Sequence, residues 1–389
     1  MPDGGEISAL YPAQRLDFAR EAAARAGLDA LLVCPGADLR YLTGYDALPF
    51  ERLTCLVLPV SGEPCLLVPA LEQPVAAASA AGASGLEIVA WNETEDPYAI
   101  AAARVSNGKR IGLDNHMWVE KAAEFRRVLP DTEQDLAGGV LSALRQRKTP
   151  AEAEALRRAG AAIDRVHARM GEWLRAGRTE REVGRDIADA ILAEGHERVD
   201  FVIVAAGPNG ASPHHEVSDR TIEPGDPVVV DIGGTTRDGY CSDSTRVYAV
   251  GEPPKEFLEL YDVLVNAQRA QVDAVRPGIT AEQLDALGRD MIAAAGYGDR
   301  FIHRTGHGIG LETHEEPYIV AGNSRRLEPG MAFSIEPGIY LPGRFGARIE
   351  DIVICTESGG ERLNRTDRDL VVLPAWRTDN STIVAGIEA

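Results

Sequence analysis

The sequence predicts an α/β domain followed by an α+β domain built on an internal repeat. Three observations support this fold class. Helix and strand patterns alternate over about the first 140 residues, a helix-start signature marks a new unit near residue 150, and three landmarks recur at nearly constant spacing in the remaining chain. With 389 residues, 44% hydrophobic and 26% charged, the composition is that of a globular protein of two or three domains.

The first domain is expected over residues 1–145. Residues 13–26 are rich in Ala and Arg with apolar positions at helical spacing, and Gly27 follows where a helix would end. Short apolar runs bounded by turn residues predict buried strands at 28–33, 53–59, 64–68 and 109–114. The alternation of these elements indicates an α/β domain.

A second domain is expected over residues 150–389. The basic stretch 145–148 precedes Thr149-Pro150-Ala151-Glu152. Thr149 would cap a helix, Pro150 would occupy its first position, and Glu152 would close a capping box. The domain boundary is therefore predicted near Arg145 to Thr149.

The second domain contains the repeat. The landmarks are a Gly before a helix (Gly177 and Gly278, 278 − 177 = 101), the end of that helix (Gly195 and Gly296, 296 − 195 = 101) and Pro-Gly before a strand (Gly225 and Gly330, 330 − 225 = 105). Because three landmarks recur in the same order, we expect two copies of a helix-then-strands unit. A pseudo-two-fold domain of this kind would hold its site between the halves.

The same offset aligns four carboxylates. Asp231 matches Glu336 (336 − 231 = 105), and Asp243 matches Glu350 (350 − 243 = 107). Each half thus offers two acids on consecutive strand-like runs, which we expect on adjacent strands of one hairpin, with the two pairs converging across the pseudo-dyad. Four carboxylates cannot all stay ionised in a low-dielectric site unless cations are present.

Two divalent ions would balance these four charges. Oxygen ligands favour Mn²⁺, and one imidazole broadens the choice to Co²⁺ or Zn²⁺. His307 is the candidate imidazole, because Gly306 and Gly308 beside it would let the backbone approach the other segments of the site closely. Paired metals can bridge a hydroxide and polarise a carbonyl, which suits the hydrolysis of an amide.

Five of the eight histidines fall in two short windows, which are His214 and His215, then His303, His307 and His314. We expect one of the first two to be functional and His215 not to be. The other three histidines, His116, His167 and His196, have no carboxylate motif nearby and are expected to be structural or exposed.

The net charge and the cysteine content limit which binding partners and which cellular compartment are expected. Lys and Arg total 40 against 60 Asp and Glu, a net charge of −20, which disfavours nucleic acid and anionic membranes as partners. No apolar run is long enough to span a bilayer, and the first residues lack the features of a signal peptide. The five cysteines form no CxxC. The chain is therefore expected to be a reduced, cytoplasmic protein.

Three segments, 305–317, 334–340 and 348–351, resemble the proline-peptidase branch of the pita-bread metallopeptidases. That group includes Xaa-Pro dipeptidase (prolidase), aminopeptidase P and methionine aminopeptidase. The resemblance covers about 150–375, and residues 27–33 and 40–44 are similar to the creatinase/prolidase N-terminal domain. It implies a pita-bread catalytic domain, a homodimer, and hydrolysis of the Xaa-Pro bond in dipeptides or short peptides by a dinuclear metal centre.

The resemblance also implies five metal ligands, Asp231, Asp243, His307, Glu336 and Glu350. In the family pattern Asp243 and Glu350 bridge both metals, Asp231 holds one, and His307 and Glu336 complete the other.

For the remaining roles, Glu336 matches the general base, and His214 matches a histidine that binds substrate and steadies the tetrahedral intermediate. His303 and His314 match histidines that contact the scissile carbonyl and the proline side. Arg348 matches an arginine that orients a ligand carboxylate.

One spacing departs from the pattern. Asp231 and Asp243 are twelve residues apart, where eleven is usual in much of the family. The turn 235–239 is the place where an extra residue is most easily accommodated.

Other functions remain open. Aminopeptidase P would act on longer Xaa-Pro-Yaa peptides, and a creatinase-like hydrolase would need no metal, although the complete ligand set disfavours it. Methionine aminopeptidases usually lack such an N-terminal domain, and a non-catalytic peptide binder would be expected to have lost ligands. Arg325 and Arg326 are candidates for binding a substrate carboxylate or are simply loop charges.

Overall fold

The computed structural model describes residues 10–105 and 108–376. The described residues form two compact units, which divide between Arg147 and Lys148. In the described ranges no helix has the length and apolar character needed to cross a bilayer. The N-terminal heptapeptide, on which the expectation about a signal peptide rested, lies outside them.

The first unit is an α/β domain with one six-stranded sheet in the order β4-β3-β2-β1-β5-β6. Its strands are β1 Ala30–Val33, β2 Cys55–Pro59, β3 Cys65–Pro69, β4 Glu87–Trp91, β5 Arg110–Leu113 and β6 Glu133–Leu136. Its helices are α2 Gln14–Arg25, α3 Ala37–Thr43, α4 Gln73–Ala78, α5 Ala80–Ala83, α6 Pro97–Val105, α7 Val119–Val128 and α8 Gly138–Gln146.

The predicted helix and four strands of this unit are confirmed as α2, β1, β2, β3 and β5. Gly27 follows α2 with φ of 71°, a left-handed conformation that glycine adopts at low cost. Strands β4 and β6, which are the two edges of the sheet, were not predicted from the sequence. The sequence of β6, Glu-Gln-Asp-Leu, offers no apolar run because this strand is not fully buried.

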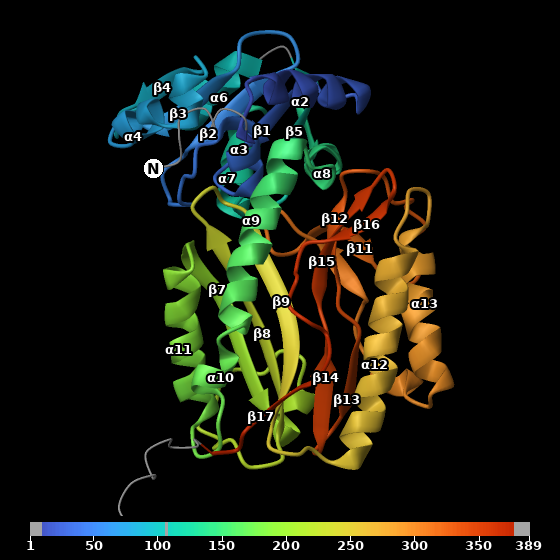
Figure 1. The fold of residues 1–389 in the computed structure, drawn as a ribbon. Helices are drawn as coiled ribbons and strands as arrows, with labels where there is room; N and C mark the ends of the chain where they lie inside the picture. The colour runs from blue at the N-terminus through green and yellow to red at the C-terminus, as the bar shows by residue number, and fades with distance from the viewer. Residues whose placement is uncertain (1–9, 106–107, 377–389) are drawn as a thin grey trace, which may run out of the picture. The chain divides into compact units, whose positions relative to one another are not determined.

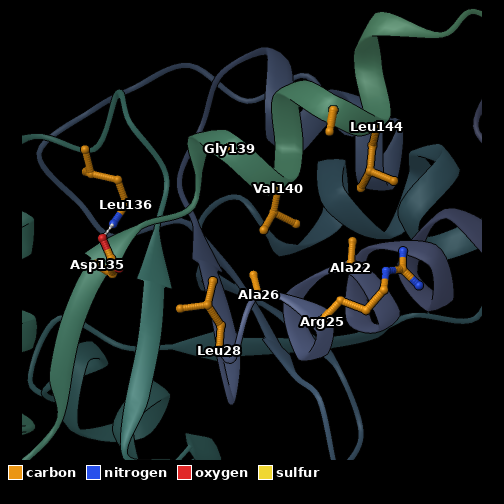
Figure 2. A pocket seen from close by; sticks show the side chains of 10 residues that line it. Ala22, Arg25, Ala26, Leu28, Asp135, Leu136, Gly139, Val140 and Leu144 are labelled. Carbon is orange, nitrogen blue, oxygen red and sulfur yellow. Dashed lines mark hydrogen bonds between the residues drawn. The ribbon is translucent and has the colours of Figure 1, made fainter.

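A shallow hollow of about 540 Å³ lies among α2, β6 and α8 (Figure 2). Small apolar side chains form most of its lining, and Arg25 and Asp135 are the charged residues among those described there. None of the predicted site residues lies there, so this hollow is not the candidate functional site.

The second unit is an α+β domain with a four-stranded sheet, β17-β9-β8-β7, a five-stranded sheet, β11-β10-β12-β15-β16, and the hairpin β13-β14. The elements of its first half are α9 Pro150–His167, α10 Met170–Trp173, α11 Glu180–Ala193, β7 His196–Ala206, the 3₁₀ helix η1 Gly207–Ala211, β8 Pro227–Thr236 and β9 Cys241–Val250. Those of its second half are α12 Lys255–Ala274, α13 Ala281–Ala294, η2 Gly298–Arg300, β10 Gly306–Gly308, β11 Glu315–Ile319, β12 Ala332–Ile335, β13 Gly338–Leu341, β14 Phe345–Arg348, β15 Asp351–Thr356, β16 Gly359–Arg362 and β17 Val371–Leu373.

The internal repeat is visible in this unit, where α9–α11 flank the strands of one half and α12–α13 flank those of the other (Figure 1). Helices α11 and α13 have 14 residues each, and each begins with a capping box. Their N-caps, Thr179 and Thr280, also form equivalent isolated β-bridges to Thr221 and Arg326. The offsets of these partners, 101 and 326 − 221 = 105, are those found in the sequence. Helix α9 begins with the predicted capping box of Thr149 and Glu152.

Strand β8 explains how a carboxylate comes to point into the interior between the halves. Val228 and Val230 pack with α9–α11, whereas Val229 belongs to the cluster that contains α12 residues. Because side chains alternate along a strand, Asp231 lies on the same face as Val229. A strand buried on both faces also accounts for the continuous apolar run around it.

The prediction that each acid pair lies on one hairpin is right for the first half and wrong for the second. Asp231 and Asp243 lie on the β8–β9 hairpin. Glu336 and Glu350 instead lie at the end of β12 and just before β15, which pair through Ile335 and Asp351 with the β13–β14 hairpin inserted between them. Pro337 has no N–H and cannot continue the ladder, so the chain leaves the sheet at this point.

The additional residue between Asp231 and Asp243 does not disturb the strands. The β8–β9 register is unbroken from Pro227 opposite Ala249 to Thr235 opposite Cys241. The turn beyond it is closed by the Thr236 N–H, which donates to the Tyr240 carbonyl over 3.0 Å. Asp231 and Asp243 therefore remain diagonal neighbours on one face of the hairpin.

The caps of the repeated helices provide a test of the fold. Thr280→Ala removes the side-chain oxygen that accepts from the Gln283 N–H and is expected to lower the free energy of unfolding by about 1 kcal/mol. Thr280→Ser keeps this oxygen and is the matched control. Urea unfolding measures both, and equal stability of the two variants would contradict a capping role.

Candidate active site

A cavity of about 1000 Å³ lies in the second unit. Every residue that sequence analysis assigned to the site lines it: Asp231, Asp243, His307, Glu336, Glu350, His214, His303, His314 and Arg348. His215, which was not expected to be functional, lines it as well. Phe201, Val202, Ile203 and Ile302 supply the apolar part of the lining.

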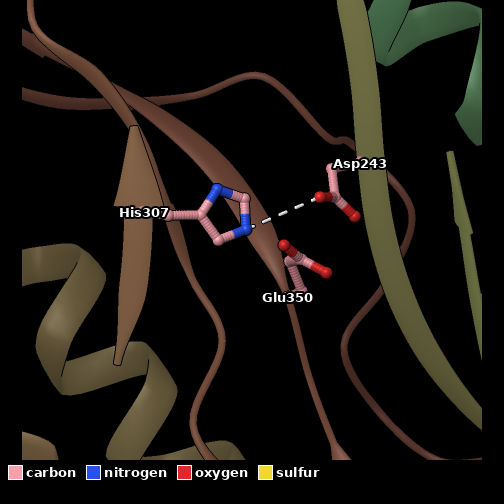
Figure 3. A group of neighbouring side chains, drawn as sticks. All are labelled: Asp243, His307 and Glu350. Atoms are coloured by element: carbon pink, nitrogen blue, oxygen red, sulfur yellow. Dashed lines mark ion pairs between the residues drawn. The ribbon is translucent and has the colours of Figure 1, made fainter. Parts of the chain in front are cut away.

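Three candidate metal ligands from separate segments of the chain meet in this cavity. Asp243 of β9, His307 of β10 and Glu350 each offer one donor atom, and these atoms lie within 4.8 Å of one another (Figure 3). Glu336 adjoins them, since its Oε1 lies 3.1 Å from His307 Nε2. Asp231 is held by Arg348, which donates to its Oδ2.

The unpaired oxygens of this cluster are the observation that tests whether a metal fits. Asp231 Oδ1, Asp243 Oδ1 and Glu350 Oε1 are buried, and none has a hydrogen-bond partner among the residues that the structure describes. A buried carboxylate oxygen without a partner is costly, and a cation is the partner that the neighbouring residues do not supply. The donor set therefore fits divalent cations.

Electrostatics leads to the same conclusion. Burial and the charges of Glu350, Asp231 and Glu336 raise the pKa of Asp243 well above its ordinary value. Burial and the charges of Glu336 and Asp231 likewise raise the pKa of Glu350. Both carboxyl groups would hold a proton unless positive charge replaced it.

His307 is oriented for a metal by its own backbone. Its Nδ1 lies 3.0 Å from the Gly308 carbonyl, which can only accept, so Nδ1 carries the proton and Nε2 faces Glu336 and Asp243. The flanking glycines allow the close packing of β10. A Cβ at Gly306 would lie 1.9 Å from the Ser334 carbonyl oxygen, and one at Gly308 would lie 2.2 Å from that of Glu316.

A chain of hydrogen bonds joins Arg348 to His303. The Arg348 guanidinium donates to the Tyr340 hydroxyl over 2.8 Å, and this hydroxyl lies 2.9 Å from His303 Nε2. His303 Nδ1 in turn donates to the Arg304 carbonyl over 2.7 Å. Both ring nitrogens of His303 are thus bonded within the protein, and a contact with substrate would have to replace Tyr340.

Tyr340 was not among the predicted site residues, although it lies in the segment 334–340, four residues after Glu336. Glu336 is ionised in this environment. Burial opposes its ionisation, but the hydrogen bond from His307 and the charges of His307, His303 and Arg348 lower its pKa to about 2.

His314 and His214 lie at the cavity without such constraints. The ring of His314 is 4.1 Å from that of His307, between centroids. His314 keeps an exposed part, but desolvation in the cavity wall and the nearby charges of His307 and Arg304 lower its pKa to about 4, so its imidazole is neutral at pH 7. His214 is exposed in the loop that follows η1.

A buried acid at each repeated helix holds a histidine-bearing loop. Glu180 of α11 is fully buried and accepts from Ser218 Oγ over 2.6 Å and from the Ala206 N–H over 2.8 Å. It also lies 2.8 Å from His215 Nε2, so His215 anchors the loop that carries His214.

Asp285 of α13 likewise holds the loop that carries His303 in the other half. It accepts from the Thr305 N–H over 3.1 Å and pairs with Arg289. Arg289 donates to the carbonyls of Phe301 and His303. Neither acid was among the predicted site residues, because neither lies in a recognisable motif.

The histidines expected to be structural or exposed lie outside the cavity. His167 and His196 are buried in contact with Tyr248 and Ser242, and burial lowers the pKa of each, to about 3 for His167. His116 is exposed. The five cysteines are buried and free. Burial raises the pKa of Cys241 to about 12, which makes this thiol a packing group rather than a nucleophile.

Two α+β halves that bring buried carboxylates and an imidazole to one cavity form the type of site used by metal-dependent hydrolases. Comparison with known protein families agrees. The Creatinase/Prolidase N-terminal domain matches residues 15–147, and Metallopeptidase family M24 matches residues 154–357. The chain belongs to metallopeptidase family M24.

Its relatives are similar over almost their whole length. The probable dipeptidase PepE of Mycobacterium tuberculosis is 54% identical over 93% of this chain and 96% of its own. The Xaa-Pro dipeptidase of Lactobacillus delbrueckii subsp. lactis is 40% identical over 90% of this chain and 96% of its own. Among solved structures, the dipeptidase PepE of Mycobacterium ulcerans has a TM-score of 0.89 and 52% identity, covering 94% of this chain and 99% of that one.

The raised carboxyl pKa values predict how stability depends on pH when metal is chelated. The folded protein then holds protons on Asp243 and Glu350 that the unfolded chain releases at about pH 4, so stability falls as pH rises from there through the folded pKa values. Each kcal/mol lost should lower Tm by about 2–4 °C.

Asp243→Asn should flatten this fall because it removes one of the repelling charges. Asp273→Asn, at an exposed position on α12, is the matched control. Thermal unfolding between pH 5 and 8 in a chelator measures the effect, and equal slopes for the two variants would contradict repulsion at the site.

Proposed function

We propose that the protein is a dinuclear metal-dependent hydrolase that cleaves the Xaa-Pro bond of dipeptides or short peptides. The observation that carries this proposal is the buried cluster of carboxylates with unpaired oxygens, in a member of family M24. A relative 40% identical bears the name Xaa-Pro dipeptidase, and another at 54% that of a probable dipeptidase, which favours dipeptides over the longer substrates of aminopeptidase P.

We assign metal binding to Asp231, Asp243, His307, Glu336 and Glu350. Two ions would balance the four carboxylates, and the oxygen-rich set favours Mn²⁺ over Co²⁺ or Zn²⁺. When bound, such ions polarise the scissile carbonyl and lower the pKa of water.

The residues of the chain handle the proton and the substrate. Ser334 Oγ donates to Glu336 Oε1 over 3.1 Å, and the Glu336 carboxylate can accept a proton from the attacking water. When the bond breaks, the prolyl nitrogen has to gain a proton to leave as a secondary amine, and Glu336 can pass on the proton taken from the water. His314, neutral at pH 7, can donate an N–H to the carbonyl oxygen, and we assign His214 to the binding of the peptide.

The wider setting of the enzyme is also part of the proposal. Five free, buried cysteines suit a reducing compartment, which supports a cytoplasmic location. The homodimer follows from the family resemblance and is testable by sedimentation. We assign the catalytic domain to residues 150–389 and the N-terminal domain to residues 1–145.

Activity of the metal-stripped protein tests the proposal. We expect cleavage of Ala-Pro to appear on addition of Mn²⁺, Co²⁺ or Zn²⁺ and to be weak on a Met-Ala-type peptide and absent on creatine. Glu350→Gln should lower kcat/KM by about 100-fold or more. Loss of a group that only hydrogen-bonds to a metal ligand already lowers activity by about 10–100-fold, and loss of a ligand itself should lower it further. Glu357→Gln, exposed in the turn after β15, is the control.

Activity that chelation leaves unchanged, or none on any peptide, would contradict a dinuclear peptidase. Better cleavage of Ala-Pro-Ala than of Ala-Pro would make the enzyme an aminopeptidase P.

The hydroxyl of Tyr340 gives a second test. Tyr340→Phe disconnects Arg348 from His303 without removing a candidate ligand, so we expect kcat to fall by about 10–100-fold with metal content unchanged. Kinetics and metal analysis of the variant measure both, and an unaltered kcat would show that the chain of hydrogen bonds does not serve catalysis.

A further inference from the structure

Arg304 is a permanent cation in the active-site cavity without a counter-ion among the residues that the structure describes. It lines this cavity together with Arg348. Arg348 is fully engaged with Asp231, Tyr340 and Thr245. The guanidinium of Arg304 makes no hydrogen bond or ion pair with any residue in the ranges 10–105 and 108–376.

The position of this guanidinium is nevertheless defined. It lies over the ring of Tyr318 on β11, 4.3 Å from the centroid, a cation–π contact that fixes the side chain and leaves its N–H groups unused. Glu216 lines the same cavity but forms no ion pair with it within the described part of the chain. The cavity therefore offers a donor fork that no carboxylate of the described residues occupies.

An Xaa-Pro dipeptide carries the group that fits this fork. Its proline ends in a carboxylate, which a guanidinium binds by two parallel, charge-assisted hydrogen bonds. In a longer peptide the same carbon is a neutral amide, and the chain continues past it. A cation placed beside the proline thus distinguishes dipeptides from longer substrates by charge.

We propose that Arg304 binds the C-terminal carboxylate of the dipeptide and is the residue that selects dipeptides over longer peptides. This inference rests on the proposed function of the site. It also replaces the earlier candidates. Arg325 and Arg326 do not line the cavity, and Arg326 donates to the Gly278 carbonyl at the isolated bridge that joins its loop to α13.

Three substrates isolate the charge of the carboxylate, namely Ala-Pro, its C-terminal amide and Ala-Pro-Ala. For Arg304→Gln in the metal-loaded enzyme we expect kcat/KM on Ala-Pro to fall by about 10–100-fold, mainly through KM, with little change on the amide and the tripeptide. Arg304→Lys keeps the positive charge but loses the two parallel N–H donors, so its kcat/KM on Ala-Pro should lie between those of the unaltered enzyme and Arg304→Gln. Arg325→Gln, the same change outside the cavity, should match the unaltered enzyme.

A binding measurement separates recognition from turnover. Free L-proline should inhibit the unaltered enzyme more strongly than L-prolinamide, and Arg304→Gln should remove this difference. An equal loss on Ala-Pro and on its amide, or an unchanged ratio between them, would overturn the assignment of Arg304. If the unaltered enzyme cleaved none of the three substrates, the proposed function itself would fail, so the two failures are distinguishable.

Discussion

The mutual repulsion of buried carboxylates is the constraint on which the rest of the catalytic unit depends. Asp243 and Glu350 come from the two halves, and burial with the charges of Glu336 and Asp231 raises the pKa of both. Two arginines supply positive charge behind this cluster. Arg348 holds Asp231, and the buried Arg246 holds both the backbone carbonyl of Glu350 and the carboxylate of Asp351. The inner oxygens are left without partners among the described residues, which is the arrangement expected where cations complete the structure.

The internal repeat is the means by which the fold meets this constraint. Each half begins a capped helix at an equivalent threonine and delivers acids from paired strands. Each half also uses an acid of that helix to hold a histidine-bearing loop, Glu180 in one and Asp285 in the other. The halves differ where the chemistry differs. Only the second half contributes a histidine ligand, His307. The glycines on either side of it let β10 lie closer to its neighbours than a side chain would allow.

Much of the fold and of the candidate site was predictable from the sequence, because the second unit contains a repeat and the strands and helices follow regular apolar patterns. The offset of 101 residues locates the equivalent helices, and the carboxylates at offsets of 105 and 107 residues line one cavity. Groups that act through distant partners left no such signal. Glu180, Asp285 and Tyr340 matter through contacts made after folding, and Arg304 stands out only because no partner in the described structure reaches it. The β13–β14 hairpin separated an acid pair that spacing alone placed on one hairpin, and the polar edge strand β6 lacked the apolar run that marks a buried strand.

The most direct test of the account is an anomalous diffraction measurement on crystals grown with Mn²⁺. We predict two peaks per chain inside the cavity, both within coordination distance of Asp243 and Glu350, and their loss in crystals of Glu350→Gln. Peaks confined to the surface, or an empty cavity in which the carboxyl groups are protonated and bonded to one another, would contradict it.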